Sequence, residues 1–284
     1  MLIDFHTHTF PPAIAGRALE KLQNASRTVA FTDGTDQGLL ASMDRSGITQ
    51  SVLLPVATNP DKVGSMNASF ALMKDPRLIR FGCAHPLDPL WEQHLEEVKA
   101  AGLPGIKLHP VYQGVDFDDP LTLRLLKKAA ELDLIVVTHA GLDIGYPGVS
   151  HVSPQMIIRA YEHISVPKLV LAHLGGWRQW EEASALLPPT GVYVDTSFAI
   201  GALTPLPGSD ASALKPMLSP KDAADVIRAF GADRVLFGTD SPWSDQAAYT
   251  ALVRSLPLSE KEKSLIFSEN ARRLLGDHIF PEPR

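Results

Sequence analysis

Residues 134–139 read Leu134-Ile135-Val136-Val137-Thr138-His139, and residues 168–173 read Lys168-Leu169-Val170-Leu171-Ala172-His173. Each stretch is an apolar run of strand length that ends on a histidine. Runs that are apolar at nearly every position, rather than at every second one, are typical of parallel strands buried on both faces. The two stretches therefore predict parallel strands that each present a histidine at the carboxyl end.

The same pattern recurs along the whole chain, because short apolar runs alternate with longer amphipathic stretches. The strand candidates are Leu2–His6, Ser51–Val56, Ile79–Ala84, Gly105–His109, Leu134–His139, Lys168–His173, Val192–Thr196 and Arg234–Gly238. The helix candidates are Gln37–Ser46, Asp61–Lys74, Pro89–Ala101, Leu121–Leu132, Ser153–His163, Gln179–Leu187, Pro220–Phe230, Asp245–Ser255 and Ser259–Leu275. Unbroken alternation predicts a parallel α/β sheet, and eight repeats predict a closed (β/α)8 TIM barrel.

An open, doubly wound sheet is the alternative architecture. Such a sheet usually carries a glycine-rich phosphate loop after its first strand, whereas this position reads His6-Thr7-His8-Thr9-Phe10-Pro11-Pro12. The strand count and the absence of that loop favour the barrel. We expect residues 1–284 to form a single domain, because this length is usual for one barrel and no interdomain linker is evident.

Three connections are longer than simple links between elements. They are Thr9–Asp36 after the first strand, with a short helical pattern at Ala18–Gln23, Gly141–His151 after the fifth, and Ser197–Leu218 after the seventh. In a barrel these loops project from the face formed by the carboxyl ends of the strands, where active sites form. We interpret them as walls of a substrate pocket, with plain surface loops as the alternative for any one of them.

Composition and charge argue against several kinds of partner. The chain is 45% hydrophobic and 20% charged, which suits a soluble protein with a large core, and its net charge of −6 gives no indication of nucleic acid or an acidic membrane as a partner. The sequence shows neither an apolar run of about 18 residues nor the pattern of a signal peptide. The only cysteine, Cys83, cannot form an internal disulfide, so we expect a cytoplasmic location.

Five side chains with metal-ligand chemistry are predicted at or just beyond the ends of strands. They are His6, His8, His139, His173 and Asp240. An isolated His-x-His pair is weak evidence, and a single buried histidine is more often hydrogen-bonded to a backbone carbonyl. His6 and His8, however, point the same way from one strand, and a barrel brings all these strand ends around one pocket. Three imidazoles and a carboxylate suit zinc and leave a position for water.

These motifs resemble those of the amidohydrolase superfamily, more narrowly the branch that includes aminocarboxymuconate-semialdehyde decarboxylase, benzoate-type decarboxylases and pyrone-dicarboxylate lactonase. The motifs are Asp4-Phe5-His6-Thr7-His8, Thr138-His139-Ala140-Gly141, Leu171-Ala172-His173-Leu174-Gly175-Gly176, Gly238-Thr239-Asp240-Ser241-Pro242 and Glu269-Asn270-Ala271-Arg272-Arg273-Leu274-Leu275, in family order over essentially the whole chain.

The resemblance implies a ligand set and catalytic roles. His6, His8, His139 and Asp240 would hold one Zn²⁺, or another divalent metal such as Mn²⁺, and Asp240 would also take a proton from the bound water. His173 would be a second ligand or an acid/base beside the metal.

The resulting chemistry has two alternatives. Metal-activated water suits hydrolysis of an amide, lactone or ester bond in a small, carboxylated molecule. The same site suits non-oxidative decarboxylation of a carboxylated aromatic or muconate-like substrate. We expect hydrolysis, because it is the commoner chemistry across the superfamily that the chain resembles.

Lys107 and His109 depart from the pattern of the decarboxylases. Other branches of the superfamily carry a carboxylated lysine at this strand, so Lys107 could hold a second metal. Lys107 and His109 share strand parity, so either could instead bind a substrate carboxylate, or one could be a satisfied interior residue. Trp177 and Trp243 directly follow site motifs and could form a pocket wall, although packing under the loops explains them equally well.

A metal-binding barrel without turnover is the non-enzymatic alternative. Structural zinc usually fills all four positions with protein ligands, often cysteines, so a set with water access favours an enzyme. We expect a small-molecule substrate and, from base rates alone, a homodimer.

Overall fold

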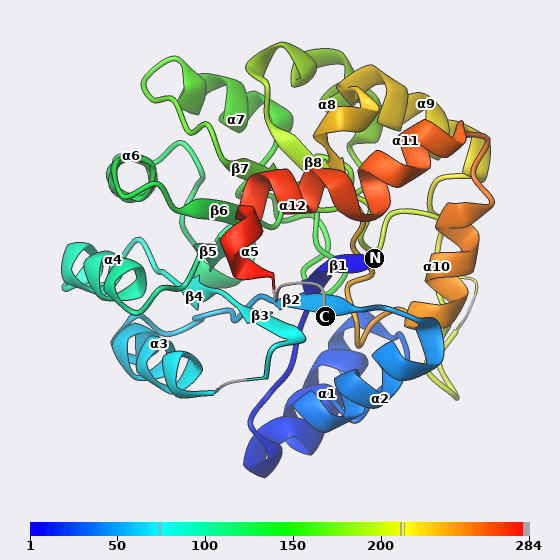
Figure 1. Cartoon of the computed structure of the whole chain (residues 1–284), viewed down its shortest axis with the longest axis horizontal. Coiled ribbons are helices and arrows are strands. Elements are labelled where there is room, and N and C mark those ends of the chain that lie inside the picture. The colour runs from blue at the N-terminus through cyan, green and yellow to red at the C-terminus, as the bar shows by residue number, and fades with distance from the viewer. Residues whose placement is uncertain (74, 211, 213, 281–284) are drawn as a thin grey trace.

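Short parallel strands form the centre of the molecule (Figure 1). The structure is a computed structural model that describes residues 1–73, 75–210, 212 and 214–280. Its strands are β1 (Ile3–Thr7), β2 (Gln50–Leu53), β3 (Leu78–Arg80), β4 (Gly82–Cys83), β5 (Gly105–Leu108), β6 (Ile135–Thr138), β7 (Leu169–Leu171), β8 (Tyr193–Asp195) and β9 (Val235–Leu236).

Strand pairing follows the order of the chain, in two sheets, β1-β2-β3 and β4-β5-β6-β7-β8-β9. The predicted strand Ile79–Ala84 is wrong as a single element, because it is divided at Phe81 into β3 and β4. The Phe81 amide still donates to the Leu53 carbonyl (3.1 Å), and on the far side the Phe5 amide donates to the Phe237 carbonyl (2.7 Å). The chain itself joins β3 to β4, and the Phe5 bond joins β1 to the segment after β9, so the two sheets form one wall and the prediction of a TIM barrel is confirmed.

Helices surround the strands (Figure 1). They are α1 (Pro12–Ser26), α2 (Asp36–Ser46), α3 (Val63–Leu72), α4 (Trp91–Ala100), α5 (Pro110–Gln113), α6 (Pro120–Glu131), α7 (Pro154–Tyr161), α8 (Trp180–Leu186), α9 (Pro220–Phe230), α10 (Gln246–Arg254), α11 (Glu260–Ser264) and α12 (Asn270–Leu275). Hydroxyl caps begin several of them: Ser153 and Ser219 each accept an amide hydrogen from the first turn, and Ser259 forms a capping box with Glu262.

Some predicted bounds need correction. The helix expected over Asp61–Lys74 begins as a 3-10 turn, Pro60–Lys62, and continues as α3 to Leu72; Lys74 lies outside the described residues. The helix expected over Ser259–Leu275 contains a π-helical turn, Leu265–Glu269, between α11 and α12. A π turn alters the hydrogen-bond spacing of the helix, and here the Ile266 carbonyl accepts from the Phe237 amide (2.9 Å), which ties the last helix to the last strand.

Alternate residues of one strand pack on opposite sides of the barrel wall. Ile135 and Val137 of β6 belong to the apolar cluster that also contains Phe5 of β1, inside the barrel. Val136 belongs to the cluster shared with the outer helices. All of these side chains are buried, which explains why the strands read as continuous apolar runs rather than alternating ones.

The three long connections lie beside one another. The loop after β1 and the loop after β8 are hydrogen-bonded, from the Val29 amide to the Thr204 carbonyl (3.1 Å) and from the Leu206 amide to the Arg27 carbonyl (2.8 Å). A Cβ atom at Gly145, in the loop after β6, would lie 3.7 Å from Ala25 of α1. The predicted loops therefore cover one end of the barrel together.

Residues 211 and 213 of the predicted Ser197–Leu218 connection, and residues 281–284 of the predicted domain, lie outside the described residues. Among the residues that are described, no helix combines the length and apolarity that crossing a bilayer requires.

Candidate metal centre

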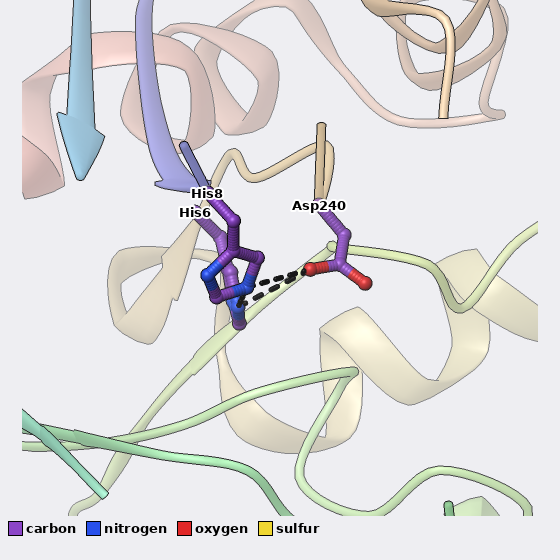
Figure 2. A group of neighbouring side chains, drawn as sticks. All are labelled: His6, His8 and Asp240. Carbon is purple, nitrogen blue, oxygen red and sulfur yellow. Dashed lines mark hydrogen bonds and ion pairs between the residues drawn. The ribbon is translucent and has the colours of Figure 1, made fainter. Parts of the chain in front are cut away.

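Three predicted ligands meet where β1 adjoins the segment after β9 (Figure 2). His6 Nε2 lies 3.2 Å from His8 Nε2, and Asp240 Oδ1 lies 3.4 Å from the first and 3.1 Å from the second. Ligand bonds of about 2.0–2.1 Å to a tetrahedral zinc ion place two ligand atoms about 3.4 Å apart. The spacing of these three side chains therefore fits one cation.

The backbone around the site is shaped for this approach. Gly238 precedes the aspartate segment, and a Cβ atom there would lie 2.9 Å from the His6 Cβ, so a side chain would push β9 away from β1. Asp240 has a φ of 65° and His173 a φ of 61°, in the left-handed region that few residues other than glycine adopt. Local strain of this kind is concentrated at functional sites.

The outer nitrogens of His6 and His8 are held by groups that face away from the site. His8 Nδ1 lies 2.7 Å from the Leu54 carbonyl, which only accepts, so this nitrogen carries the proton. His6 Nδ1 lies 2.7 Å from Asp195 Oδ2. His6 consequently turns an unprotonated Nε2 toward Asp240, and His8 also faces Asp240 with its Nε2 (3.1 Å).

His139 and His173 are each held in the same way, by a backbone carbonyl bound to one ring nitrogen. His139 Nε2 donates to the Leu142 carbonyl (3.0 Å), and His173 Nδ1 donates to the Ser197 carbonyl (2.9 Å). The remaining nitrogens, His139 Nδ1 and His173 Nε2, lie 3.1 Å apart, and in the neutral rings both carry lone pairs. His139 thus faces His173, whereas the closest ligand group consists of His6, His8 and Asp240.

Burial keeps the rings of His6, His139 and His173 neutral at neutral pH. Burial lowers the pKa of His6 to about 4, and it lowers the pKa of His139 and of His173 below the ordinary value. The His6–His8–Asp240 group is continued by His173, whose ring stacks on His6 (5.4 Å between centroids), and by His139 beyond it, so imidazole nitrogens and one carboxylate gather in one buried region. Acceptor atoms gathered this closely repel one another unless a cation lies among them, so the residues present fit a divalent metal.

The two carboxylates of the pocket are ionised. Burial alone would raise the pKa of Asp240, but the hydrogen bond to His8 and the neighbouring histidines lower it to about 2. Burial opposes ionisation of Asp195 too, and His6 and His173 nevertheless hold its pKa below the usual range.

Lys107 lies in the same pocket. Its Nζ is 3.1 Å from His6 Nε2, and the side chain is buried. Burial lowers its pKa to about 8, against the opposite effect of Asp195 and Asp240. The predicted inward orientation of Lys107 is thus observed, and its role remains a prediction.

His109 lies between two rings, Tyr112 at 3.8 Å and His139 at 4.3 Å between centroids. Its Nε2 is 3.6 Å from Asp143 Oδ2, so His109, His139 and Asp143 form a second group of potential ligands. The planes of the two imidazoles differ by only 12°, and a cation cannot lie in both planes, where the lone pairs point. This group fits a second metal poorly and fits a wall of the pocket well.

The two tryptophans differ in setting. Trp177 is buried, and its indole N–H donates to the Phe198 carbonyl (3.0 Å), so it packs beneath the loop after β8. Trp243 is half-buried, and its backbone amide donates to the Asp240 carbonyl (2.8 Å).

Sequence reasoning missed Asp195 and Ser197. Ser197 Oγ lies 3.0 Å from both His6 Nδ1 and His173 Nδ1, and it donates to Asp195 Oδ1. Asp195 is the last residue of β8. The rule that found the histidines, polar residues at the carboxyl end of a barrel strand, could have found it too.

Comparison with known proteins places these features in a family. The family model described as "Amidohydrolase" matches residues 3–276. None of the curated proteins matches the sequence.

Solved structures share the fold at low identity. An uncharacterised TIM-barrel protein from Bordetella bronchiseptica matches with a TM-score of 0.70 at 19% identity, over 96% of this chain and 98% of that one. A 5-carboxyvanillate decarboxylase from Sphingomonas paucimobilis matches with a TM-score of 0.65 at 18% identity, over 96% and 98%. A 5-carboxyvanillate decarboxylase from Novosphingobium aromaticivorans, solved with bound manganese, matches with a TM-score of 0.67 at 15% identity, over 97% of each chain. A structure described only as an amidohydrolase matches as well.

Proposed function

Because the chain belongs to the amidohydrolase family, we propose that it is a metal-dependent enzyme that hydrolyses an amide, lactone or ester bond of a small, carboxylated molecule. The observation that carries the proposal is the buried group of His6, His8 and Asp240, with His173 stacked on His6 and His139 Nδ1 3.1 Å from His173 Nε2.

His6, His8, His139 and Asp240 are the proposed ligands. Three imidazoles and a carboxylate suit Zn²⁺, and the manganese in one structure of the same fold makes Mn²⁺ the second choice. A divalent ion held there supplies Lewis acidity, which activates water near neutral pH and polarises a substrate carbonyl.

The protein's own groups would then move protons and hold the substrate. Asp240 Oδ1, between His6 and His8, is placed to accept a proton from the attacking water and to return it to the leaving group. His173 Nε2 faces the pocket and can exchange a second proton. Lys107 and His109 are the candidates for binding a substrate carboxylate.

Decarboxylation is the second candidate. It is supported by the two 5-carboxyvanillate decarboxylases whose structures share this fold. The residues are the same, but His173 Nε2 would first accept a proton from water and then deliver it to the carbon that loses CO₂.

The two chemistries differ in their products. The apoprotein, reloaded with Zn²⁺ or with Mn²⁺, is screened against lactones, amides, esters and carboxylated aromatics, with acid release and CO₂ release measured separately. Hydrolysis predicts acid without CO₂. Release of CO₂ from a carboxylated aromatic, without hydrolysis of any ester or amide, would replace the first candidate by the second.

Replacing Asp240 by asparagine distinguishes an enzyme from a structural metal site. Asparagine tolerates the left-handed backbone at this position, so Asp240→Asn should fold, but its amide cannot accept the proton. We expect kcat to fall by about 100-fold or more while part of the metal is retained. Metal content and kcat are measured beside Asp44→Asn, an exposed aspartate in a surface ion pair, which should match the wild type. Undiminished turnover in Asp240→Asn would contradict the assignment.

A further inference from the structure

The Asp195 carboxylate, behind the proposed metal ligands, is contacted by four hydrogen-bond donors. Its Oδ1 accepts from the amide of His173 (3.0 Å), the amide of Ser197 (3.0 Å) and the Ser197 hydroxyl. Its Oδ2 faces His6 Nδ1 at 2.7 Å. The side chain is fully buried, so no water competes for these contacts.

The donors on Oδ1 decide how the carboxylate can act on His6. All three come from the loop segment that carries His173 or from Ser197 itself, and they fix the plane of the carboxylate. Oδ2 is left with one partner, the His6 ring. An ionised carboxylate only accepts, so His6 must carry its proton on Nδ1 and offer its Nε2 lone pair to the metal.

Ser197 connects this carboxylate to a second ring. Its hydroxyl proton is committed to Asp195 Oδ1, so its oxygen can only accept from His6 Nδ1 and His173 Nδ1, each at 3.0 Å. Both histidines are thereby held in the tautomer that directs an electron pair inward.

We propose that Asp195, supported by the Ser197 hydroxyl, is a positioning residue that fixes His6 in its metal-binding tautomer and holds His173 in the matching one. The inference rests on the proposed function, since it takes His6 as a metal ligand.

A neighbouring side chain provides the matched control. Thr196 lies between the two residues and is equally buried, but its hydroxyl donates to the Gly238 carbonyl (2.9 Å) and accepts from the Gly238 amide (3.1 Å). It therefore joins β8 to the backbone of the segment after β9, and both of these hydrogen bonds go to Gly238 rather than to an imidazole. Thr196→Val should cost stability without changing the His6 tautomer.

The test is metal affinity, measured by titration calorimetry of the apoproteins with Zn²⁺. The asparagine amide in Asp195→Asn can lie in two ways. If its NH₂ faces His6 Nδ1, the imidazole proton must move to Nε2. If its oxygen faces His6, its NH₂ instead lies against the three donors that now bind Asp195 Oδ1. We expect Asp195→Asn to bind Zn²⁺ about 10- to 100-fold more weakly. Ser197→Ala should lose less, about threefold, and Thr196→Val should bind like the wild type.

A spectroscopic measurement keeps the proposal falsifiable if Asp195→Asn does not fold. The ¹⁵N spectrum of histidine-labelled wild-type apoprotein, with His6 assigned from a His6→Gln variant, should show a protonated Nδ1 and an unprotonated Nε2. Protonation of Nε2 would overturn the inference, as would Asp195→Asn binding Zn²⁺ within threefold of the wild type. Failure of the wild type to bind Zn²⁺ or Mn²⁺ at all would instead overturn the proposed function.

Discussion

Lys107 is the residue whose charge bears most directly on the metal site. Its Nζ lies 3.1 Å from the nitrogen with which His6 would bind a metal. Two like unit charges about 4 Å apart repel by about 4 kcal/mol at the effective dielectric of a protein surface site, and a divalent ion doubles that figure. The neutral amine avoids the repulsion, and burial, which lowers the pKa of Lys107 to about 8, brings the neutral form within reach near neutral pH.

The number of metal ions per chain tests whether Lys107 is itself a metal ligand. We expect one metal per chain, because the stacked rings of His109 and His139 do not fit a second ion. Metal analysis of the protein loaded in bicarbonate buffer should give one equivalent, and Lys107→Gln should give the same. Two equivalents in the wild type and one in Lys107→Gln would mean that carboxylated Lys107 holds a second metal.

For single residues, the sequence predicted the candidate ligands and missed the residues that hydrogen-bond to them from behind. His6, His8 and Asp240 could be placed together because a barrel brings strand ends around one axis. Their orientation depends on Asp195 and Ser197; the strand-end rule could have placed Asp195 at this end of the barrel, but no spacing rule predicts its contact with His6. Only the register of β8 beside β9, and of β9 beside β1, brings them into contact.

Among the elements, the divided strand shows what the local sequence does not reveal. Cys83 of β4 cannot pair with β2, which ends at Leu53, and the side chain of Asn67 in α3 takes the place of that strand. The Asn67 oxygen accepts from the Cys83 amide (2.8 Å), and its nitrogen donates to the Cys83 carbonyl (3.0 Å). A helix side chain thus satisfies the backbone where the barrel wall opens.

Removal of this side chain should therefore destabilise the barrel. Asn67→Ala leaves two buried backbone groups of Cys83 without partners, and we expect the free energy of unfolding to fall by about 2–4 kcal/mol. Urea denaturation measures the loss. Asn24→Ala, at an exposed position of α1, is the matched control and should change stability by less than about 0.5 kcal/mol. Equal stability of the two variants would show that Asn67 does not support β4.

Helix starts were easier to predict than helix extents. Ser153, Ser219 and Ser259 begin helices as expected, because a hydroxyl cap is a local signal. α1 runs over Pro12–Ser26, much longer than the predicted Ala18–Gln23. The prediction was too short because the helix has no side-chain cap to mark its start and contains Gly16, which lowers helix propensity. Its length is set by packing against the other loops.

For the whole molecule, the site lies on the seam where the chain closes on itself. His6 and His8 belong to the first strand and its end, and Asp240 follows the last strand. The backbone bonds of this seam include the Asp240 amide to the His6 carbonyl (2.8 Å) and the His8 amide to the Ser241 carbonyl (2.7 Å). A metal held by these three side chains would link the same two segments a second time.

Metal binding should accordingly stabilise the fold, and most strongly at the seam. A ligand at about 1,000 times its Kd adds about 4 kcal/mol, so chelation should lower Tm by about 8 °C or more. Hydrogen exchange locates the effect: the amides of His8 and Asp240 should lose protection on chelation, whereas β6, far from the seam in strand order, should change only as far as global stability does. Asp240→Asn should show a smaller difference between its metal-loaded and chelated forms, since one of the bridging side chains is impaired. Loss of protection that is as large in β6 as at the seam, with Tm unchanged, would contradict a metal that bridges β1 and the segment after β9.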